Sequence, residues 1–318
     1  MEQNFITDRK SKIFPTIGIV LIIFFLCVAI LLFARMYLGK PLVEEYGNVG
    51  IVELQGIILD SKTIIEELEA FRKNEDIRAI IVRVDSPGGA VGPSQEIYEE
   101  IQKIRKEKKV IASLGNVAAS GGYYAIAAAD RIVANPSTIT GSIGVILQML
   151  NFKDLAEWAK LKSITMKSGK FKDFGGGGWR DITPEERALM TTILDDIHNE
   201  FIGAVAIGRG LDKAIVRKLA DGRVFTGRQA KANGLVDELG GLEFAKDIAK
   251  TLADIDEDIK AIYPKKSGMD FLNLFLNEEE SSSKLEHFLK SSGWSKYGLL
   301  LAPIFQSLFT SERTIKIQ

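Results

Sequence analysis

Apolar and polar residues alternate along residues 49–251 in the manner of a layered domain built from strands and helices. Residues 49–59 and 79–84 are mostly apolar runs with the length of buried strands. Residues 61–73 and 94–105 carry apolar side chains at helical spacing. Because strand-like and helix-like segments follow one another in turn, the pattern predicts an α/β domain.

A glycine-containing loop is predicted after the second strand, at residues 85–89, with the sequence Asp-Ser-Pro-Gly-Gly. By default its glycines are turn residues. Two functional alternatives are a cradle for a nucleotide phosphate and a surface of free backbone N–H groups that faces a developing oxyanion. The chain has neither a G-x-G-x-x-G pattern nor a Walker lysine, which weakens the nucleotide alternative.

The N-terminal part contains an apolar run without charge, residues 13–33. As a helix it would be about 31 Å long, which matches the hydrocarbon core of a bilayer. Three basic residues precede the run and two follow it within seven residues, so the positive-inside bias places residues 1–12 in the cytoplasm. A cleavable signal peptide is the alternative, but residues 34–40 contain no A-x-A-like cleavage site. We therefore expect an uncleaved single-pass anchor in the cell membrane, with the catalytic domain on the extracytoplasmic side.

The chain after the anchor divides by composition. A linker at residues 34–48 leads into the domain at residues 49–251, and residues 252–318 form a C-terminal extension. This extension is acidic at residues 277–283 and apolar at residues 293–309. The apolar part is short and interrupted for a second span, so we expect an amphipathic tail that contacts membrane or another subunit.

Composition excludes several classes of function. The 41 basic and 42 acidic residues give a net charge of −1, which does not favour nucleic-acid binding. The single cysteine, Cys27, lies in the apolar run, where we expect a small apolar residue rather than a disulfide partner. The sequence has no H-E-x-x-H motif, cysteine cluster or phosphate loop, so we expect no metal and no organic cofactor.

One hydroxyl stands among very small residues at residues 118–124, Ala-Ala-Ser-Gly-Gly-Tyr-Tyr. Glycine permits the tight turn from strand to helix that displays a serine nucleophile, here Ser120. The alternative is a serine that caps a helix beside a close backbone contact. We expect the rings of Tyr123 and Tyr124 to pack beneath this helix, with the lining of a substrate groove as the alternative.

A serine nucleophile needs a base, which is usually a histidine. The two histidines, His198 and His287, are interpreted as ordinary helix-face or surface residues. A lysine replaces histidine where burial lowers its pKa from about 10.4 by about 3 units, at a cost of about 4 kcal/mol. Lys167, Lys170 and Lys172 compete for this role, although the default for each is a solvated charge.

Six motifs in a fixed order resemble the signal peptide peptidase A family, in its short, anchored form rather than its tandem form. They are Asp-Ser-Pro-Gly-Gly at 85–89, Ala-Ala-Ser-Gly-Gly-Tyr-Tyr at 118–124, Thr-Gly-Ser-Ile-Gly-Val at 140–145, Lys-Ser-Gly-Lys-Phe-Lys-Asp at 167–173, Ile-Thr-Pro-Glu-Glu-Arg at 182–187, and the segment at 221–241. The resemblance covers about residues 49–251.

The resemblance implies a serine endopeptidase in which Ser120 is the nucleophile and Lys172, 52 residues later, is the general base. It implies that Ser142 hydrogen-bonds the lysine and orients it, with a turn or cap serine as the alternative. For the oxyanion hole we expect backbone N–H groups from Gly88 or Gly89 on one side and from Gly121 on the other.

The resemblance also implies a fold of the crotonase and Clp protease type, a superhelix of stacked β-β-α units. The family assembles into a dome-shaped homo-oligomer, and the serine and lysine of one site are expected to come from neighbouring subunits. Its substrates are hydrophobic peptides, such as remnants of cleaved signal peptides, met beside membrane lipid. Four glycines at residues 175–178 depart from the family pattern and are interpreted as a flexible segment. A serine hydrolase with His198 as base and a degenerate scaffold on the membrane are the alternative functions.

Overall fold

The computed structural model describes residues 24–28 and 46–264, and Val43–Pro264 form one compact unit. The expected anchor lies outside the described residues except for residues 24–28, which are helical. Residues 265–318, with most of the expected tail, also lie outside them. Within the described ranges, we find no helix with both the length and the apolar character that crossing a bilayer requires.

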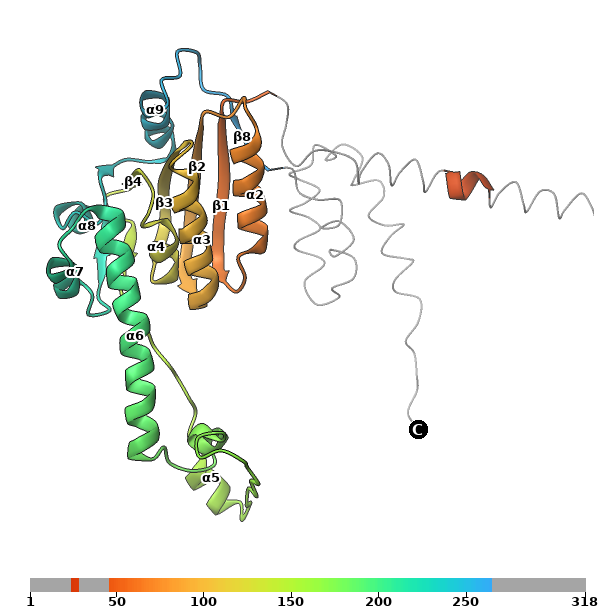
Figure 1. Cartoon of the computed structure of the whole chain (residues 1–318), viewed down its shortest axis with the longest axis vertical. Coiled ribbons are helices and arrows are strands. Elements are labelled where there is room, and N and C mark those ends of the chain that lie inside the picture. The colour runs from red at the N-terminus through yellow and green to blue at the C-terminus, as the bar shows by residue number, and fades with distance from the viewer. Residues whose placement is uncertain (1–23, 29–45, 265–318) are drawn as a thin grey trace, which may run out of the picture. The chain divides into compact units, whose positions relative to one another are not determined.

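The compact unit is built on one mixed sheet of eight strands (Figure 1). The strands are β1 (Val49–Ile58), β2 (Ala79–Gly89), β3 (Lys109–Ala119), β4 (Arg131–Ala134), β5 (Ile139–Gly141), β6 (Val224–Thr226), β7 (Glu238–Leu239) and β8 (Ala261–Ile262). The main order is β6-β5-β3-β2-β1-β8, while β4 pairs with β3 and β7. All pairs are parallel except β5 with β6. The mixed α/β prediction is confirmed.

Helices connect and cover the strands. They are α2 (Lys62–Lys73), α3 (Val91–Ile104), α4 (Gly121–Ile126), α5 (Lys153–Trp158), α6 (Pro184–Arg209), α7 (Lys213–Leu219), α8 (Gly227–Ala232) and α9 (Leu242–Leu252), with a 3₁₀ turn, η1, at Phe174–Gly178. The predicted helix at residues 61–73 is confirmed. The loop predicted at residues 85–89 is wrong, because β2 continues to Gly89 and pairs there with the end of β1.

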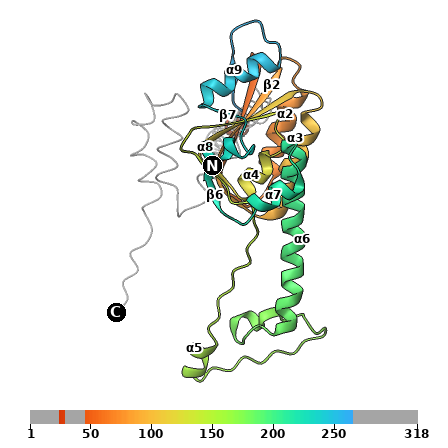
Figure 2. The ribbon, with the colours of Figure 1, turned by 90° about the vertical axis from the view of Figure 1, so that its left-hand side faces the viewer.

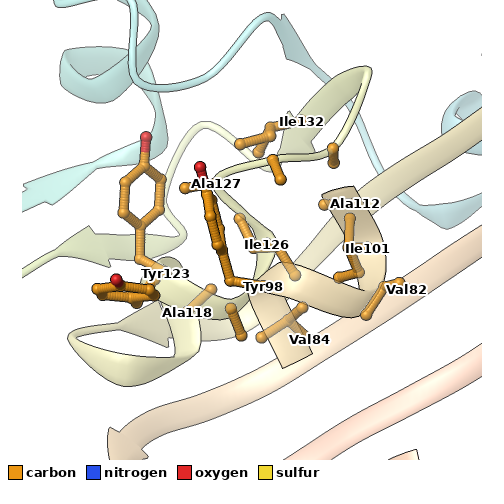
Figure 3. Packing of buried hydrophobic residues seen from close by; sticks show 14 of the residues in the cluster. Val82, Val84, Tyr98, Ile101, Ala112, Ala118, Tyr123, Ile126, Ala127 and Ile132 are labelled. Atoms are coloured by element: carbon orange, nitrogen blue, oxygen red, sulfur yellow. The ribbon is translucent and has the colours of Figure 1, made fainter. Parts of the chain in front are cut away.

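Both faces of the central parallel strands are covered, which is why their sequences are apolar at nearly every position. On one face, α2, α3 and α4 pack over the even-numbered residues of β2, among them Val82 and Val84 (Figures 1 and 3). On the other face, Ala245 and Ala249 of α9 pack over Ile81 and its neighbours. The strands are therefore held rigidly from both sides.

The two tyrosines that follow Ser120 belong to the first of these cores. Tyr123 is fully buried and lies among the core side chains that Figure 3 draws. Its hydroxyl donates to the Leu235 carbonyl at 2.7 Å. The ring of Tyr124 lies between those of Tyr98 and Phe201, at centroid distances of 5.5 and 4.6 Å. Both rings therefore anchor α4 in the core and do not line a groove.

Helix α6 leaves the core half-way along its length. Its last turns bury Phe201, Ile202 and Val205, whereas most of its first half is exposed. Its 26 residues span about 39 Å. We call residues 146–190 the arm: it contains α5, η1 and the start of α6, and it extends away from the sheet (Figure 2).

We expect Tyr123→Phe to lower the free energy of unfolding by about 1–3 kcal/mol, because it leaves the buried Leu235 carbonyl without a donor. Thermal unfolding of the full-length protein should show a melting temperature several degrees lower. Tyr46→Phe is the control, since Tyr46 is exposed and should melt like the parent. Equal melting of all three proteins would contradict this role of the Tyr123 hydroxyl.

Candidate active site

Ser120 lies at the junction of β3 and α4. Its backbone has φ 52° and ψ −124°, a conformation that costs free energy in a residue other than glycine. Its N–H donates to the Gly141 carbonyl at 2.9 Å, and its own carbonyl accepts from the N–H groups of Tyr123 and Tyr124. The Ser120 side chain is half-buried and makes no cap hydrogen bond with α4. The strained turn therefore presents the hydroxyl instead of using it as a helix cap.

The end of β2 meets the turn at Ser120. A Cβ built on Gly88, which has φ 105°, would lie 2.7 Å from the Gly121 nitrogen and 2.9 Å from the Ser120 Cβ. A Cβ built on Gly121 would overlap the Ser94 Oγ and lie 3.2 Å from the Gly89 nitrogen. The structure thus brings Ser120 together with all three glycines, and no side chain fits between the two segments.

The backbone nitrogens of Gly89 and Gly121 lie at this meeting point. The Gly88 N–H donates to the buried Ser86 Oγ at 3.1 Å and is already used. The Ala90 N–H donates to Ile58 on β1, so the alternation of an extended chain turns the Gly89 N–H away from β1. Gly121 is the first residue of α4, where no carbonyl within the helix accepts its N–H. Of the sequence-predicted donors, Gly89 and Gly121 are thus the pair that the geometry favours.

Ser142 also lies beside the Ser120 turn. It follows Gly141, whose carbonyl accepts from the Ser120 N–H. Its own N–H donates to the Arg223 carbonyl at 2.9 Å, and its φ of 50° is the second unusual serine conformation at this place. The structure therefore brings Ser142 to Ser120, while its hydrogen bond to Lys172 stays a prediction.

Lys172 lies elsewhere in the same chain, on the arm. It is exposed, and its N–H closes a turn on the Gly169 carbonyl at 3.3 Å. The arm loop contacts α6 at Glu186, which lies 15 residues, or about 22 Å of helix, before Phe201. Phe201 is the residue of α6 that contacts the ring of Tyr124 on α4. Within one protomer, the structure does not bring Lys172 to Ser120.

The three lysines of the arm differ in their partners. Lys167 forms an ion pair with Asp173 and donates to the Lys170 carbonyl at 3.0 Å. Lys167 is also the main cause that lowers the pKa of Asp173. Lys170 pairs with Glu185 at 2.5 Å. In the described part of the chain, the side chain of Lys172 has no hydrogen bond or ion pair. Lys172 is therefore the member of the three whose amine is free for other work.

His198 lies on α6, one turn before Phe201. Its Nε2 atom is buried and has no hydrogen-bond partner among residues 24–28 and 46–264. It therefore makes no hydrogen bond through this atom to Ser120, as a base would. His287 lies outside the described residues. In the same two ranges, no group of three or more His, Cys, Asp or Glu side chains is arranged to hold a metal ion.

Sequence reasoning missed two serines that shape the site. Ser86 is fully buried and accepts from the Gly88 N–H, and Ser94 is buried against Gly121 while its hydroxyl donates to the Ala90 carbonyl at 2.8 Å. The sequence offered a signal for Ser86, which lies inside the motif Asp-Ser-Pro-Gly-Gly at residues 85–89. Nothing in the helical pattern distinguishes Ser94 from an ordinary helix residue.

Comparison with known proteins places this site in a family context. The sequence profile of Peptidase family S49 matches residues 102–256, which include Ser120, Ser142 and Lys172, and that of Clp protease matches residues 48–140. The "Putative protease slr0021" of Synechocystis sp. is 42% identical over 213 residues, which are 66% of this chain and 76% of that protein.

Two further relatives carry more explicit names. The "Putative signal peptide peptidase SppA" of Enterococcus faecium is 36% identical over 227 residues, 66% of each chain. The chloroplastic "Serine protease SPPA" of Arabidopsis thaliana is 36% identical over 206 residues, which are 65% of this chain and 30% of that longer protein.

We expect Gly121→Ala to destabilise the turn at Ser120 by about 1–3 kcal/mol, because the new methyl group overlaps the Ser94 Oγ. Ser94→Ala removes that oxygen. The double variant Gly121→Ala/Ser94→Ala should therefore lose less free energy of unfolding than the two single variants lose together. Thermal unfolding of the four proteins measures this coupling. Additive effects would contradict the close contact between the two residues.

Proposed function

Since the chain belongs to the signal peptide peptidase A family of serine peptidases, peptidase family S49, we propose that it is a membrane-anchored serine endopeptidase. Ser120 is the nucleophile and Lys172 the general base. The observation that carries this assignment is the strained, uncapped Ser120 beside two backbone N–H groups. Residues 13–33 are the proposed anchor, and the catalytic domain is extracytoplasmic. The stacked β-β-α superhelix belongs to the same proposal.

The proposed reaction uses Ser120, Lys172 and the two backbone N–H groups. The Ser120 Oγ attacks the peptide carbonyl carbon while the neutral amine of Lys172 takes the hydroxyl proton. The carbonyl oxygen becomes an oxyanion that accepts from the Gly89 and Gly121 N–H groups. Collapse of this intermediate breaks the C–N bond, and the lysine returns the proton to the leaving amine. Water then attacks the acyl ester, with the same lysine as base, and releases Ser120.

The base is supplied by a neighbouring copy of the chain. This part of the proposal is supported by the separation of Lys172 from Ser120 within one protomer and by the lack of a side-chain partner for Lys172 among residues 24–28 and 46–264. The arm also exposes many large apolar side chains, and exposed apolar surface of this kind is typical of a protein–protein contact. They are Ile146, Leu147, Met149, Leu150, Leu155, Trp158, Leu161, Ile164, Met166, Phe171, Trp179 and Leu189. A neighbour that covers the arm supplies the dry surroundings in which a lysine amine gives up its proton.

The substrate class is extended, hydrophobic peptide, such as the remnant of a cleaved signal peptide. Support comes from the apolar run at residues 13–33, which would hold the enzyme beside the bilayer where such peptides are released, and from the name of the Enterococcus faecium relative. Ser142 is the proposed partner that orients the lysine amine, since it lies beside the Ser120 turn. No metal or organic cofactor takes part in the proposed reaction.

A fluorophosphonate probe should label the full-length protein at Ser120. We expect Ser120→Ala to abolish labelling, and Lys172→Ala to reduce its rate by at least about 10²-fold, because proton removal by a positioned base contributes that much. Lys170→Ala is the matched control, since that lysine is already paired with Glu185, and it should label at nearly the parent rate. Parent-like labelling of Lys172→Ala would reject Lys172 as the base.

Mixing tests whether the two residues come from different copies. Ser120→Ala and Lys172→Ala chains, dissociated in detergent and reassembled together, should regain labelling on the chain that retains Ser120. The physical reason is that such a site then combines Ser120 of one copy with Lys172 of the other. Distinct affinity tags identify the labelled chain. Co-assembly without labelling would show that serine and lysine must belong to the same chain.

A further inference from the structure

We propose that Arg180, held by Glu186, is a positioning residue that fixes the loop carrying Lys172. This inference rests on the proposed role of Lys172 and adds two residues to it. Both belong to a polar network at the start of α6 that the proposed reaction does not otherwise use. The network ties Asp173, the residue directly after Lys172, to the helix.

The first link joins Arg180 to α6. Its Nη1 and Nη2 donate to the two carboxylate oxygens of Glu186, at 2.9 and 2.7 Å, in the bidentate geometry of a strong arginine–carboxylate pair. Glu186 is only 3% exposed and belongs to a capping box with Thr183, so its carboxylate cannot swing away without loss of the cap. The Arg180 guanidinium holds the pKa of the Glu186 carboxyl well below its usual range.

The second link joins Arg180 to the loop that carries Lys172. Its Nη2 donates to the Asp173 carbonyl at 3.0 Å and lies 3.4 Å from the Asp173 carboxylate. Lys167 pairs with the same carboxylate from the other side and donates to the Lys170 carbonyl. The backbone on both sides of Lys172 is therefore fixed by charged contacts, while no described residue binds the Lys172 side chain.

A pocket of about 270 Å³ lies between the loop and the start of α6, and Phe171, Arg180 and Glu186 contribute to its lining. Beside this pocket, the ion pairs of Arg180 with Glu186 and Asp173 join the loop to α6. Loss of the pair between Arg180 and the buried Glu186 should let the loop move, even where the helix itself is intact.

The glycine run makes the second link possible. Gly175, Gly176, Gly177 and Gly178 have φ values of 63°, 56°, 60° and 89°, so they form a left-handed turn rather than the flexible segment expected from the sequence. Each residue with a side chain would cost about 1–2 kcal/mol in this conformation. The turn starts with the Gly176 N–H on the Asp173 carbonyl, at 2.7 Å, and returns the chain so that Arg180 reaches the same carbonyl.

The consequence for catalysis is geometric. A general base must lie within hydrogen-bond distance of the proton it removes, and a misplacement of about 1 Å reduces the rate by about 10²-fold. If a neighbouring copy provides Lys172, any displacement of its arm displaces the lysine amine relative to Ser120. Arg180 and Glu186 limit that error where the arm loop joins α6.

Glu186→Gln tests the proposal with little damage to the helix, since glutamine also serves in a capping box. We expect the rate of fluorophosphonate labelling, per assembled oligomer of full-length protein, to fall by about 10²-fold, and the midpoint of its pH–rate profile to move. Glu185→Gln is the matched control: it removes the adjacent carboxylate, whose partner is the exposed Lys170. It should label within about twofold of the parent, as exposed pairs contribute little.

The outcomes separate the inference from the proposed function. Equal labelling rates of Glu186→Gln and Glu185→Gln, together with a loss of labelling in Lys172→Ala, would overturn the positioning role alone. Parent-like labelling of Lys172→Ala would overturn both. If Glu186→Gln fails to assemble, Arg180→Lys takes its place, because lysine keeps the charge but loses the fork between Glu186 and Asp173. A parent-like pH–rate profile in assembled Arg180→Lys would likewise overturn the positioning role.

Discussion

The contact between the end of β2, residues 86–89, and the turn at residues 119–121 is the constraint on which the site depends. β2 and β3 run parallel, with Ser86 opposite Ala118, so the two segments lie at the same edge of the sheet. They approach so closely that a Cβ on Gly88 or Gly121 would overlap its neighbours. The core holds this approach in place, because Tyr123 and Tyr124 bury the helix that follows Ser120. The strain at Ser120 persists because its surroundings are rigid.

The arm has the opposite physical character. Its buried residues are few, its large apolar side chains are mostly exposed, and charged contacts hold its loop to α6. Lys172 is thus placed by the less rigid part of the molecule and Ser120 by the most rigid part. On the proposed function, assembly brings the two together, and a protomer by itself holds a nucleophile without a base. A polar network that stiffens the arm is then a requirement for accurate docking.

Much of the central fold could be predicted from the sequence. Buried parallel strands and amphipathic helices give strong periodic signals, and β1, α2 and the first half of β2 follow them. The end of β2 could not be found this way, because Asp-Ser-Pro-Gly-Gly has the composition of a turn while pairing with β1 decides its conformation. Helix α6 continues past the buried Phe201 to Arg209. Gly208 lies inside it because a side chain there would overlap the Ala127 carbonyl.

The relation between Ser120 and Lys172 could not be predicted from their spacing, because a separation of 52 residues does not determine a distance in space. The length of α6 determines it, and this helix carries the arm away from the core. The glycine run shows a similar limit. Four glycines in sequence allow both a flexible linker and a left-handed turn, since glycine adopts positive φ without strain. The chain adopts the left-handed turn. Residues with side chains would adopt its positive φ angles only with strain, so a run that composition interprets as flexible is a turn that requires glycine. Arg180 reaches Asp173 because the glycines allow this turn.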